Sequence, residues 1–249
     1  MEAKAPGSLK QIQSLKKELI GFMISYKFAL NEVNTKIDIL KQEFQYIHDY
    51  NPIEHVNSRL KSPESIFKKI QRKGYDLSLE SIRENIRDIA GIRITCSFIS
   101  DIYEISNMLR KQKDIKVIEC KDYIKNPKPN GYQSLHLIIQ IPIFMSDREE
   151  HIPVEIQIRT IAMDFWASLE HKIYYKYNRE VPKNIKDDLK EAAISAAQLD
   201  RKMENIHKEM KKIKERINVE EEEKELVLNN ERFSIPQELL LSLVKMANK

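Results

Sequence analysis

The sequence predicts an α+β domain built on one mixed β-sheet, with helical extensions at both ends of the chain. Two patterns predict this class. Segments in which apolar and polar residues alternate, typical of half-buried strands, occur between about residues 91 and 159. Segments with apolar residues at three- and four-residue steps, typical of helices, lie before, between and after them. The chain has 249 residues, 41% of them hydrophobic and 32% charged, so it is long enough to bury a core beneath a charged surface.

One or two helices are expected over residues 8–50, followed by a further one. From residue 8 to about 50 apolar residues recur at helical spacing, and no proline intervenes until Pro52. A further helix is expected to begin at Ser62 and Pro63, because serine caps helix N-termini and proline suits the first helical position. It should end at Gly74, since glycine favours the C-terminal cap.

The middle of the chain contains the predicted strands. Residues at alternate positions from Gly91 to Phe98 are apolar, which places them on one face of a half-buried strand. A helix over Ile102 to Lys111 and a loop over residues 126–131 interrupt the pattern. The other expected strands are Val117 to Cys120, Tyr132 to Ile141, and Val154 to Arg159.

The last third of the chain reads as helical. Helices are expected over Ile161 to Tyr177 and over Lys186 to Val219. The final segment, Phe233 to Lys249, is more apolar than a disordered tail, so we expect it to pack, with another subunit as one candidate partner. The expected organisation is an N-terminal helical extension (1–50), a central domain (51–180) and C-terminal helices that serve oligomerisation (181–249).

Composition excludes several function classes. No apolar run reaches the roughly 20 residues needed to cross a membrane. The chain start has no secretory pattern, and Cys96 and Cys120 cannot build a disulfide framework, so we expect a cytoplasmic protein. The five glycines are too dispersed for a Walker loop or a dinucleotide fingerprint, so bound phosphates must be held by side chains. Residues 57–136 contain 16 Lys and Arg against 10 Asp and Glu, and an anionic ligand is expected there.

A basic segment is the first candidate binding element. It runs from Arg59 to Lys73, and it places Lys69, Arg72 and Lys73 on one side of the predicted helix. Ile66 and Ile70 are left to face the core. Several cationic donors suit a polyphosphate. The alternative is a solvated basic face, which is common on surface helices.

Two carboxylates are candidates for a magnesium–nucleotide site. Asp88 lies in the turn before a strand, and alternation in the strand Val154 to Arg159 directs Glu155, Gln157 and Arg159 to one face. Mg²⁺ in nucleotide sites takes one or two carboxylates. The alternatives are local ion pairs of Asp88 with Arg87 or Arg93, favoured by spacing alone, and of Glu155 with Arg159.

The strand from Tyr132 to Ile141 adds two candidate ligand contacts. Its alternation directs Leu135 and its apolar successors inward, and Tyr132, Ser134 and His136 outward. An exposed tyrosine beside a lysine-rich loop can stack on a base, and a histidine can contact a phosphate. The alternative is that the tyrosine packs within the sheet.

Four motifs in order resemble a known family. They are Arg59-x-Lys61-Ser62-x-x-Ser65, RDIAGIR (Arg87 to Arg93), KDYIKNPKPNGYQSLH (Lys121 to His136) and VEIQIRTIAMDFWASLEHKIYYK (Val154 to Lys176). Together they are similar to the synthetase domain of the RelA/SpoT homologues, over about residues 50–180. In length the chain resembles the stand-alone small alarmone synthetases.

The resemblance implies a nucleotidyltransferase-like fold and transfer of the pyrophosphate group of ATP to the 3′-hydroxyl of GTP or GDP, with release of AMP. It implies that Asp88 binds Mg²⁺ and that Glu155 supports the metal site and positions or deprotonates the hydroxyl. It also implies a homotetramer. The ATP-binding residues it implies are Arg59, Lys61, Ser65, Lys69, Arg72 and Arg93, with the two guanidinium groups Arg59 and Arg93 stacking on adenine. The acceptor-binding residues are Lys121, Lys128, Tyr132, His136 and Gln157, with Tyr132 stacking on guanine.

One departure and two alternatives accompany this resemblance. Glu119 stands where many family members carry a basic residue, which leaves the preferred phosphorylation state of the acceptor open. One alternative is a catalytically weak regulator that binds guanine nucleotides or single-stranded RNA through the same basic face. The other is a nucleotidyltransferase that acts on RNA ends and releases pyrophosphate.

Overall fold

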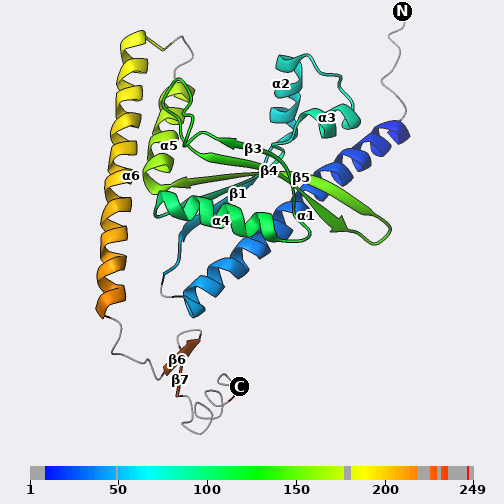
Figure 1. The fold of residues 1–249 in the computed structure, drawn as a ribbon. Helices are drawn as coiled ribbons and strands as arrows, with labels where there is room; N and C mark the ends of the chain where they lie inside the picture. Colours follow the sequence, from blue (N-terminus) through cyan, green and yellow to red (C-terminus); the bar gives the residue numbers. More distant parts are fainter. Residues whose placement is uncertain are drawn as a thin grey trace, which may run out of the picture.

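The molecule is organised around a five-stranded mixed β-sheet (Figure 1). The computed structural model describes residues 9–48, 50–176, 181–217, 225–228, 231–234 and 246. The strand order is β1-β2-β5-β4-β3; β2 and β5 run parallel, and the other neighbouring strands are antiparallel. The strands are β1 (Ile53–Leu60), β2 (Ala90–Cys96), β3 (Lys116–Asp122), β4 (Leu135–Phe144) and β5 (Glu149–Thr160).

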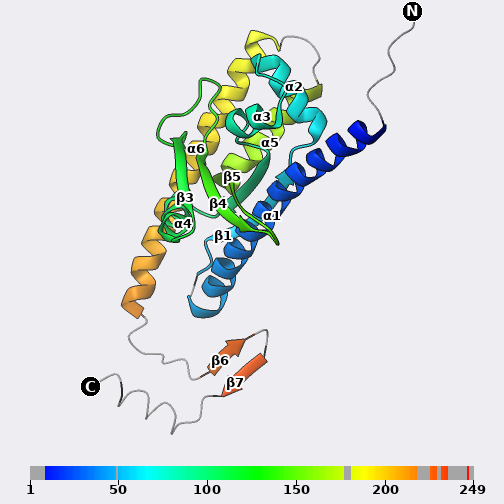
Figure 2. The same cartoon turned by 90° about the vertical axis from the view of Figure 1, so that its right-hand side faces the viewer.

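Helices surround the sheet at one face and at its ends. Helices α1 and α4 both pack on the apolar face of the sheet, and α6 lies beyond α5 (Figure 2). A short hairpin, β6 (Glu225–Leu228) with β7 (Glu231–Ser234), pairs separately from the main sheet. The helices are α1 (Leu9–Ile47), α2 (Pro63–Lys73), α3 (Leu79–Asn85), α4 (Ile99–Lys111), α5 (Ile161–Lys176) and α6 (Lys183–Ile217).

The core lies on one face of the sheet. Alternate residues of β4 and β5 are fully buried, among them Leu137, Ile139 and Ile156. Because successive side chains of a strand point to opposite faces, these apolar residues form one surface. Buried residues of α1 and α4, such as Val33 and Ile105, belong to the same cluster. The opposite face therefore carries the polar residues of the strands and is free to form a site.

The predicted fold class and most predicted elements are confirmed. Residues 9–47 form one continuous helix, and α2 begins after Ser62, whose Oγ accepts a hydrogen bond from the Ser65 N–H (3.2 Å), and ends at Gly74 with φ +69°. Four elements were not predicted: β1, α3, and the two strands of the β6–β7 hairpin. Strand β1 has almost no alternation, because Asn57 and the residues after it are exposed, so no periodic pattern marks it.

Other boundaries differ from the predictions by a few residues. Strand β4 begins at Leu135, so Tyr132 precedes the strand, and Ser134, predicted to face outward, is buried with its Oγ donating to the Ile158 carbonyl (3.1 Å). No helix in the described part of the chain is long and apolar enough to cross a membrane. Most of the apolar segment 233–249 lies outside the described residues.

Gly131 fixes the loop that precedes β4. Its φ is +89°, a conformation that side-chain-bearing residues rarely adopt. A Cβ at this position would lie 2.5 Å from the Cβ of Ala193 on α6. The loop therefore rests directly on α6, and only glycine allows that approach.

We expect Gly131→Ala to lower the free energy of unfolding by about 1–3 kcal/mol, because the variant adds backbone strain and a steric clash. In a chain of this size Tm falls by about 2–4 °C for each kcal/mol. The control is Gly21→Ala in α1, where a Cβ meets nothing within 4 Å. In that control the free energy of unfolding should rise by about 0.5–1 kcal/mol, because alanine has a higher helix propensity than glycine. Equal stabilities of the two variants in thermal unfolding would contradict the role of Gly131.

Candidate active site

Strand register assembles the site on the polar face of the sheet. Residues paired across β1, β2, β5, β4 and β3 form two rows that cross all five strands. The first row is Asn57, Arg93, Gln157, His136 and Lys121. The second row is Arg59, Gly91, Glu155, Ile138 and Glu119. Residues distant in sequence thus become neighbours at the spacing of adjacent strands, about 5 Å.

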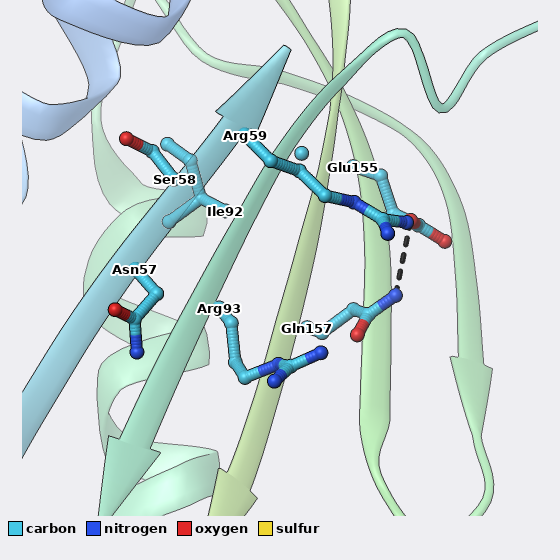
Figure 3. A pocket seen from close by; sticks show the side chains of 8 residues that line it. Asn57, Ser58, Arg59, Ile92, Arg93, Glu155 and Gln157 are labelled. Carbon is cyan, nitrogen blue, oxygen red and sulfur yellow. Dashed lines mark hydrogen bonds between the residues drawn. The ribbon is translucent and has the colours of Figure 1, made fainter. Parts of the chain in front are cut away.

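A cavity of about 130 Å³ opens where the two rows cross β1, β2 and β5 (Figure 3). Arg59 and Arg93 reach toward it from β1 and β2, and Glu155 closes its far side. Gly91 has no side chain between Arg59 and Glu155, and a Cβ there would lie 3.5 Å from the Arg59 Cγ and Nε. The glycine thus leaves the Arg59 side chain free to lie across the sheet.

Asp88 is held by two lysines rather than by its sequence neighbours. It precedes β2, and its Oδ2 accepts a hydrogen bond from the Lys61 ammonium, while Oδ1 lies 2.8 Å from Lys69 Nζ on α2. Burial raises the pKa of the Asp88 carboxyl, but the two ammonium groups outweigh burial and hold the pKa below its usual range. The local pairs with Arg87 or Arg93 favoured by spacing are not formed, because the turn directs Asp88 toward α2 instead.

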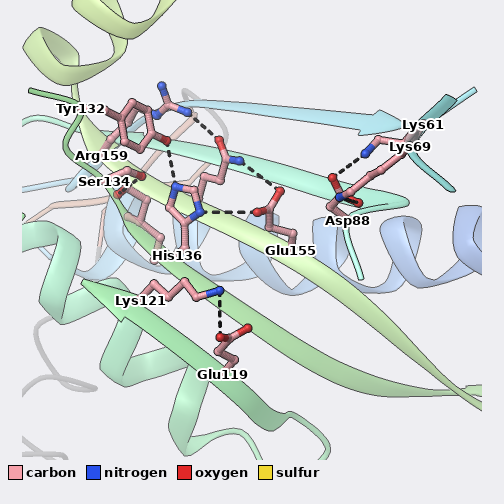
Figure 4. A network of polar contacts seen from close by, with 12 residues as sticks. Lys61, Lys69, Asp88, Glu119, Lys121, Tyr132, Ser134, His136, Glu155 and Arg159 are labelled. Atoms are coloured by element: carbon pink, nitrogen blue, oxygen red, sulfur yellow. Dashed lines mark hydrogen bonds and ion pairs between the residues drawn. The ribbon is translucent and has the colours of Figure 1, made fainter. Parts of the chain in front are cut away.

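Glu155 lies near the centre of a hydrogen-bonded chain (Figure 4). Its Oε2 accepts from Gln157 Nε2 (3.0 Å) and its Oε1 lies 3.4 Å from His136 Nδ1. Burial raises the pKa of the Glu155 carboxyl, but His136 and Gln157 lower it further, against the charge of Asp88, so the pKa is below its usual range. The group is therefore ionised at neutral pH. Gln157 stands between Glu155 and Arg159, so these two do not form the direct ion pair considered as an alternative.

Tyr132 forms an aromatic and cationic cluster beside this chain. Its hydroxyl is 2.8 Å from His136 Nε2, and its ring is edge-on to Tyr123 at 6.1 Å. Lys128 Nζ lies over both tyrosine rings, at 4.7 Å from Tyr132 and 4.6 Å from Tyr123. Burial raises the pKa of the Tyr132 hydroxyl, so it stays protonated. The ring is half-buried rather than exposed as predicted, because it lies in the loop against the sheet.

Lys121, at the β3 end of the first row, is paired with Glu119. Their side chains are 2.9 Å apart, and this contact raises the pKa of the Lys121 ammonium. Both groups lie at the edge of the sheet and are partly exposed. Glu119, which departs from the family pattern, therefore neutralises Lys121, a predicted phosphate ligand.

Two predicted ATP ligands lie on α2 away from these contacts. Ser65 is in the first turn, where its backbone N–H and Oγ bond to the Ser62 Oγ. Arg72 is exposed in the last turn. Arg72 is thus solvent-exposed, as the alternative for this basic segment predicted, whereas Lys69 on the same helix contacts Asp88. The apolar side of α2 is as predicted, because Ile66 and Ile70 are buried.

The structure adds site residues that the sequence did not single out. Tyr123 joins the Tyr132 cluster, and Asn57 and Ser58 line the cavity. Asp164 on α5 contacts Arg93 (3.3 Å) and Arg159 (3.5 Å). The strand alternation placed Arg159 on the site face, but its contacts depend on α5, which no local pattern reveals.

Asp88 and Glu155 are the two groups suited to hold a divalent cation. Their carboxylates are close enough for the charge of Asp88 to raise the pKa of Glu155, yet the pKa of each stays below its usual range. Ionised oxygen ligands are those that Mg²⁺ prefers. No cluster of three or more His, Cys, Asp or Glu side chains suited to a metal occurs within the described ranges. The arrangement thus offers two ionised carboxylates as candidate ligands of a divalent cation.

Comparisons with known proteins agree with this geometry. Residues 58–180 match the family described as a region found in RelA / SpoT proteins. The chain is 56% identical over 188 residues to GTP pyrophosphokinase YwaC of Bacillus subtilis, covering 76% of this chain and 90% of that protein. The crystal structure of small alarmone synthetase 2 from B. subtilis matches with TM-score 0.71 and 54% identity, over 77% of this chain and 99% of that one. Small alarmone synthetase 1 of B. subtilis, bound to its product pppGpp, matches with TM-score 0.72 and 39% identity, over 78% and 98%.

We expect Asp88→Asn to lower stability at pH 7 by about 1 kcal/mol, because the variant leaves Lys61 and Lys69 facing each other without a charged partner. The folded-state pKa of Asp88 is depressed, so its stabilisation is present above the ordinary value of 3.8 and is lost as pH falls through the folded-state pKa. The difference in Tm between wild type and variant should therefore be largest at neutral pH and shrink on acidification.

Thermal unfolding followed by circular dichroism from pH 7 to pH 3 measures this difference. The control is Asp147→Asn, which removes a carboxylate that is 69% exposed and paired with Arg148. That variant should stay within about 0.5 kcal/mol of wild type. A Tm difference for Asp88→Asn that is independent of pH would contradict the charge-pair assignment.

Proposed function

The chain belongs to the RelA/SpoT family, and from this membership and the site geometry we propose that it is a (p)ppGpp synthetase. It transfers the pyrophosphate group of ATP to the 3′-hydroxyl of GTP or GDP and releases AMP, as a GTP pyrophosphokinase of the stringent response. The observation that carries the proposal is the position of two ionised carboxylates, Asp88 and Glu155, between two groups of cations and rings, one for each nucleotide.

The ATP side of the site is formed by β1, β2 and α2. Arg59 and Arg93 line the cavity, and planar guanidinium groups stack well on a purine ring. Lys61 and Lys69 are half-buried and lie on the Asp88 carboxylate, so they are placed to bind the phosphates of ATP. Ser65 and Arg72, at the two ends of α2, extend the phosphate contacts once ATP is bound.

The acceptor side is formed by β3, β4 and the loop between them. Tyr132 supplies the ring on which guanine stacks, and Lys128, already over that ring, supplies a charge for the acceptor phosphates. Gln157 and His136 contribute hydrogen bonds from the first row of the sheet. Lys121 must leave Glu119 to bind a phosphate, so Glu119 competes with the acceptor for this lysine.

The transfer needs positioning and charge neutralisation rather than a covalent nucleophile. The 3′-hydroxyl oxygen forms a bond to the β-phosphorus of ATP, and the bond from that phosphorus to the oxygen bridging the α-phosphorus breaks, so AMP leaves. Glu155, ionised and held by His136 and Gln157, accepts the hydrogen bond of the 3′-hydroxyl and takes its proton. The lysines and arginines offset the negative charge of the transferred group.

Asp88 and Glu155 are the residues that would hold Mg²⁺. When bound, the ion would neutralise negative charge on the phosphates. The carboxylate of Asp88 is satisfied by two ammonium groups in this structure. The same cluster would offer one ionised carboxylate to the ion and two ammonium groups to the phosphates, so its donor set suits a metal–nucleotide complex.

We also propose a cytoplasmic homotetramer in which one contact is an antiparallel pairing of α6. Apolar residues on α6 that are 45–54% exposed follow alternate steps of four and three: Leu199, Met203, Ile206, Met210 and Ile213. This is the seam of a coiled coil. In an antiparallel pair centred between Met203 and Ile206, Lys202 of each copy faces Glu209 of the other, whereas a parallel pair sets Lys202 against His207.

Single-stranded RNA as a regulator stays a prediction from the sequence.

We expect Asp88→Ala and Glu155→Gln each to reduce transfer by at least about 10³-fold with the fold intact, since each removes a group at the reacting centre. The assay supplies Mg²⁺, GDP or GTP, and ATP labelled in its γ-phosphate, then quantifies labelled guanosine nucleotide and AMP. Asp147→Ala, far from the site face, is the control. Wild-type turnover in either site variant would sink the assignment. Product attached to RNA with pyrophosphate release would favour a nucleotidyltransferase, and binding without transfer a regulator.

We expect light scattering of the purified chain at micromolar concentration to give about four times 29.4 kDa. Lys202→Glu should weaken the assembly, because it sets like charges opposite each other, and Lys202→Glu with Glu209→Lys should restore it. The matched control is Lys190→Glu, elsewhere on α6. A monomeric wild-type protein, or equal assembly of all variants, would contradict the antiparallel pairing.

A further inference from the structure

Arg159 is a buried cation at the end of β5 for which the proposed reaction has no direct use. Its side chain is only 2% exposed, and burial lowers the pKa of its guanidinium. A charge removed from water must be compensated by charged or polar partners. The partners of Arg159 are therefore informative about its role.

The first partner of Arg159 is Gln157. Arg159 Nη2 donates to Gln157 Oε1 over 2.6 Å, and Gln157 Nε2 donates to Glu155 Oε2 over 3.0 Å. A guanidinium can only donate hydrogen bonds, so it fixes the carbonyl end of the Gln157 amide toward itself. The NH₂ end then faces Glu155. Without Arg159 the amide keeps only its bond to Glu155, so the carbonyl end loses the partner that fixes its position.

The other partners of Arg159 lie beside the two nucleotide subsites. The guanidinium carbon is 5.7 Å from the centre of the Tyr132 ring, within cation–π range. Nη1 is 3.5 Å from Asp164 Oδ1, and the same carboxylate oxygen is 3.3 Å from Arg93. Asp164 thus offsets the repulsion between the two arginines. Figure 4 shows Arg159 beside Tyr132, at the opposite end of the network from Asp88.

We propose that Arg159 is a positioning residue that holds Glu155 ready for the 3′-hydroxyl by locking the orientation of the Gln157 amide. This inference rests on the proposed function, because it assigns Glu155 to the acceptor hydroxyl. Tyr132 keeps Lys128 and His136 as partners without Arg159, and Arg93 keeps Asp164. Loss of Arg159 should therefore affect turnover more than nucleotide binding.

The test is Arg159→Lys, which keeps the charge but loses the planar fork that reaches Gln157 and Asp164 together. We expect kcat to fall about 10–100-fold, the usual effect of removing a group that orients a functional side chain. The KM values for ATP and for GDP should each change less than about 3-fold. The matched control is Arg148→Lys in the β4–β5 turn, where the arginine also joins two carboxylates, Asp147 and Glu150. It should keep wild-type kcat.

A double-mutant cycle with Gln157→Met separates positioning from a general structural role. If Arg159 acts through Gln157, adding Arg159→Lys to Gln157→Met should lower kcat by less than about 3-fold more. If the fold-reductions in kcat of the two single variants multiply in the double variant, the proposal is overturned. So would wild-type kcat in an Arg159→Lys protein that differs only in Tm.

A readout independent of turnover separates this inference from the proposed function. In ¹⁵N-glutamine-labelled protein, the side-chain amide resonances of Gln157, assigned with Gln157→Met, should shift in Arg159→Lys and not in Arg148→Lys. If the resonances shift in Arg159→Lys while the wild-type protein transfers no pyrophosphate, the locked amide is supported and the reaction is rejected. If the resonances do not shift in Arg159→Lys while the wild-type protein does transfer pyrophosphate, only the locking of the Gln157 amide by Arg159 is rejected.

Discussion

The alternation of side chains across a five-stranded sheet is the constraint on which this site depends. Apolar residues of β4 and β5 must all face α1 and α4 to form the core, so the residues between them must face the other way. Pairing in register then sets these polar residues in two rows across the strands. A shift of one residue in β5 would bury Glu155 and expose Ile156. Core packing and site geometry are therefore specified together.

Several charges of the site are paired with one another. Asp88 holds two lysines, Glu119 holds Lys121, and Asp164 holds two arginines. Each pairing lowers the cost of keeping charged groups partly out of water. For these cations nucleotide binding must exchange a carboxylate for a phosphate, so their contribution to affinity depends on the difference between the two contacts. Such exchange makes the site selective for ligands with several negative charges.

Helix α6 supports the site although it contributes no residue to the two rows. Thr160 ends β5, and its Oγ1 donates to Asp200 of α6 (2.5 Å) while accepting from the Met163 N–H at the start of α5. Gly131, next to Tyr132, lies against Ala193 of the same helix. Both the β5 end and the acceptor loop therefore rest on α6. An assembly formed through the exposed side of α6 would stabilise the surface on which the site is built.

The sequence by itself determined the fold class, the strands β2 and β5, the capped helix α2 and the face shared by Glu155, Gln157 and Arg159. These features follow from alternation, helical spacing and cap residues, which are local. The motifs that carry the family resemblance are likewise short and contiguous in the sequence. Strand β1 was missed because its exposed residues show no alternation.

Only the tertiary structure decided which charges meet. Lys61 and Lys69 contact Asp88 although 27 and 19 residues separate them, and Asp164 of α5 joins Arg93 of β2 to Arg159 of β5. Spacing favoured nearby partners for Asp88, yet the turn before β2 directs it toward α2. Ion pairs act over a few ångströms in space and are indifferent to sequence separation. The sequence therefore determines the faces of the elements, and the packing of those elements determines the pairs.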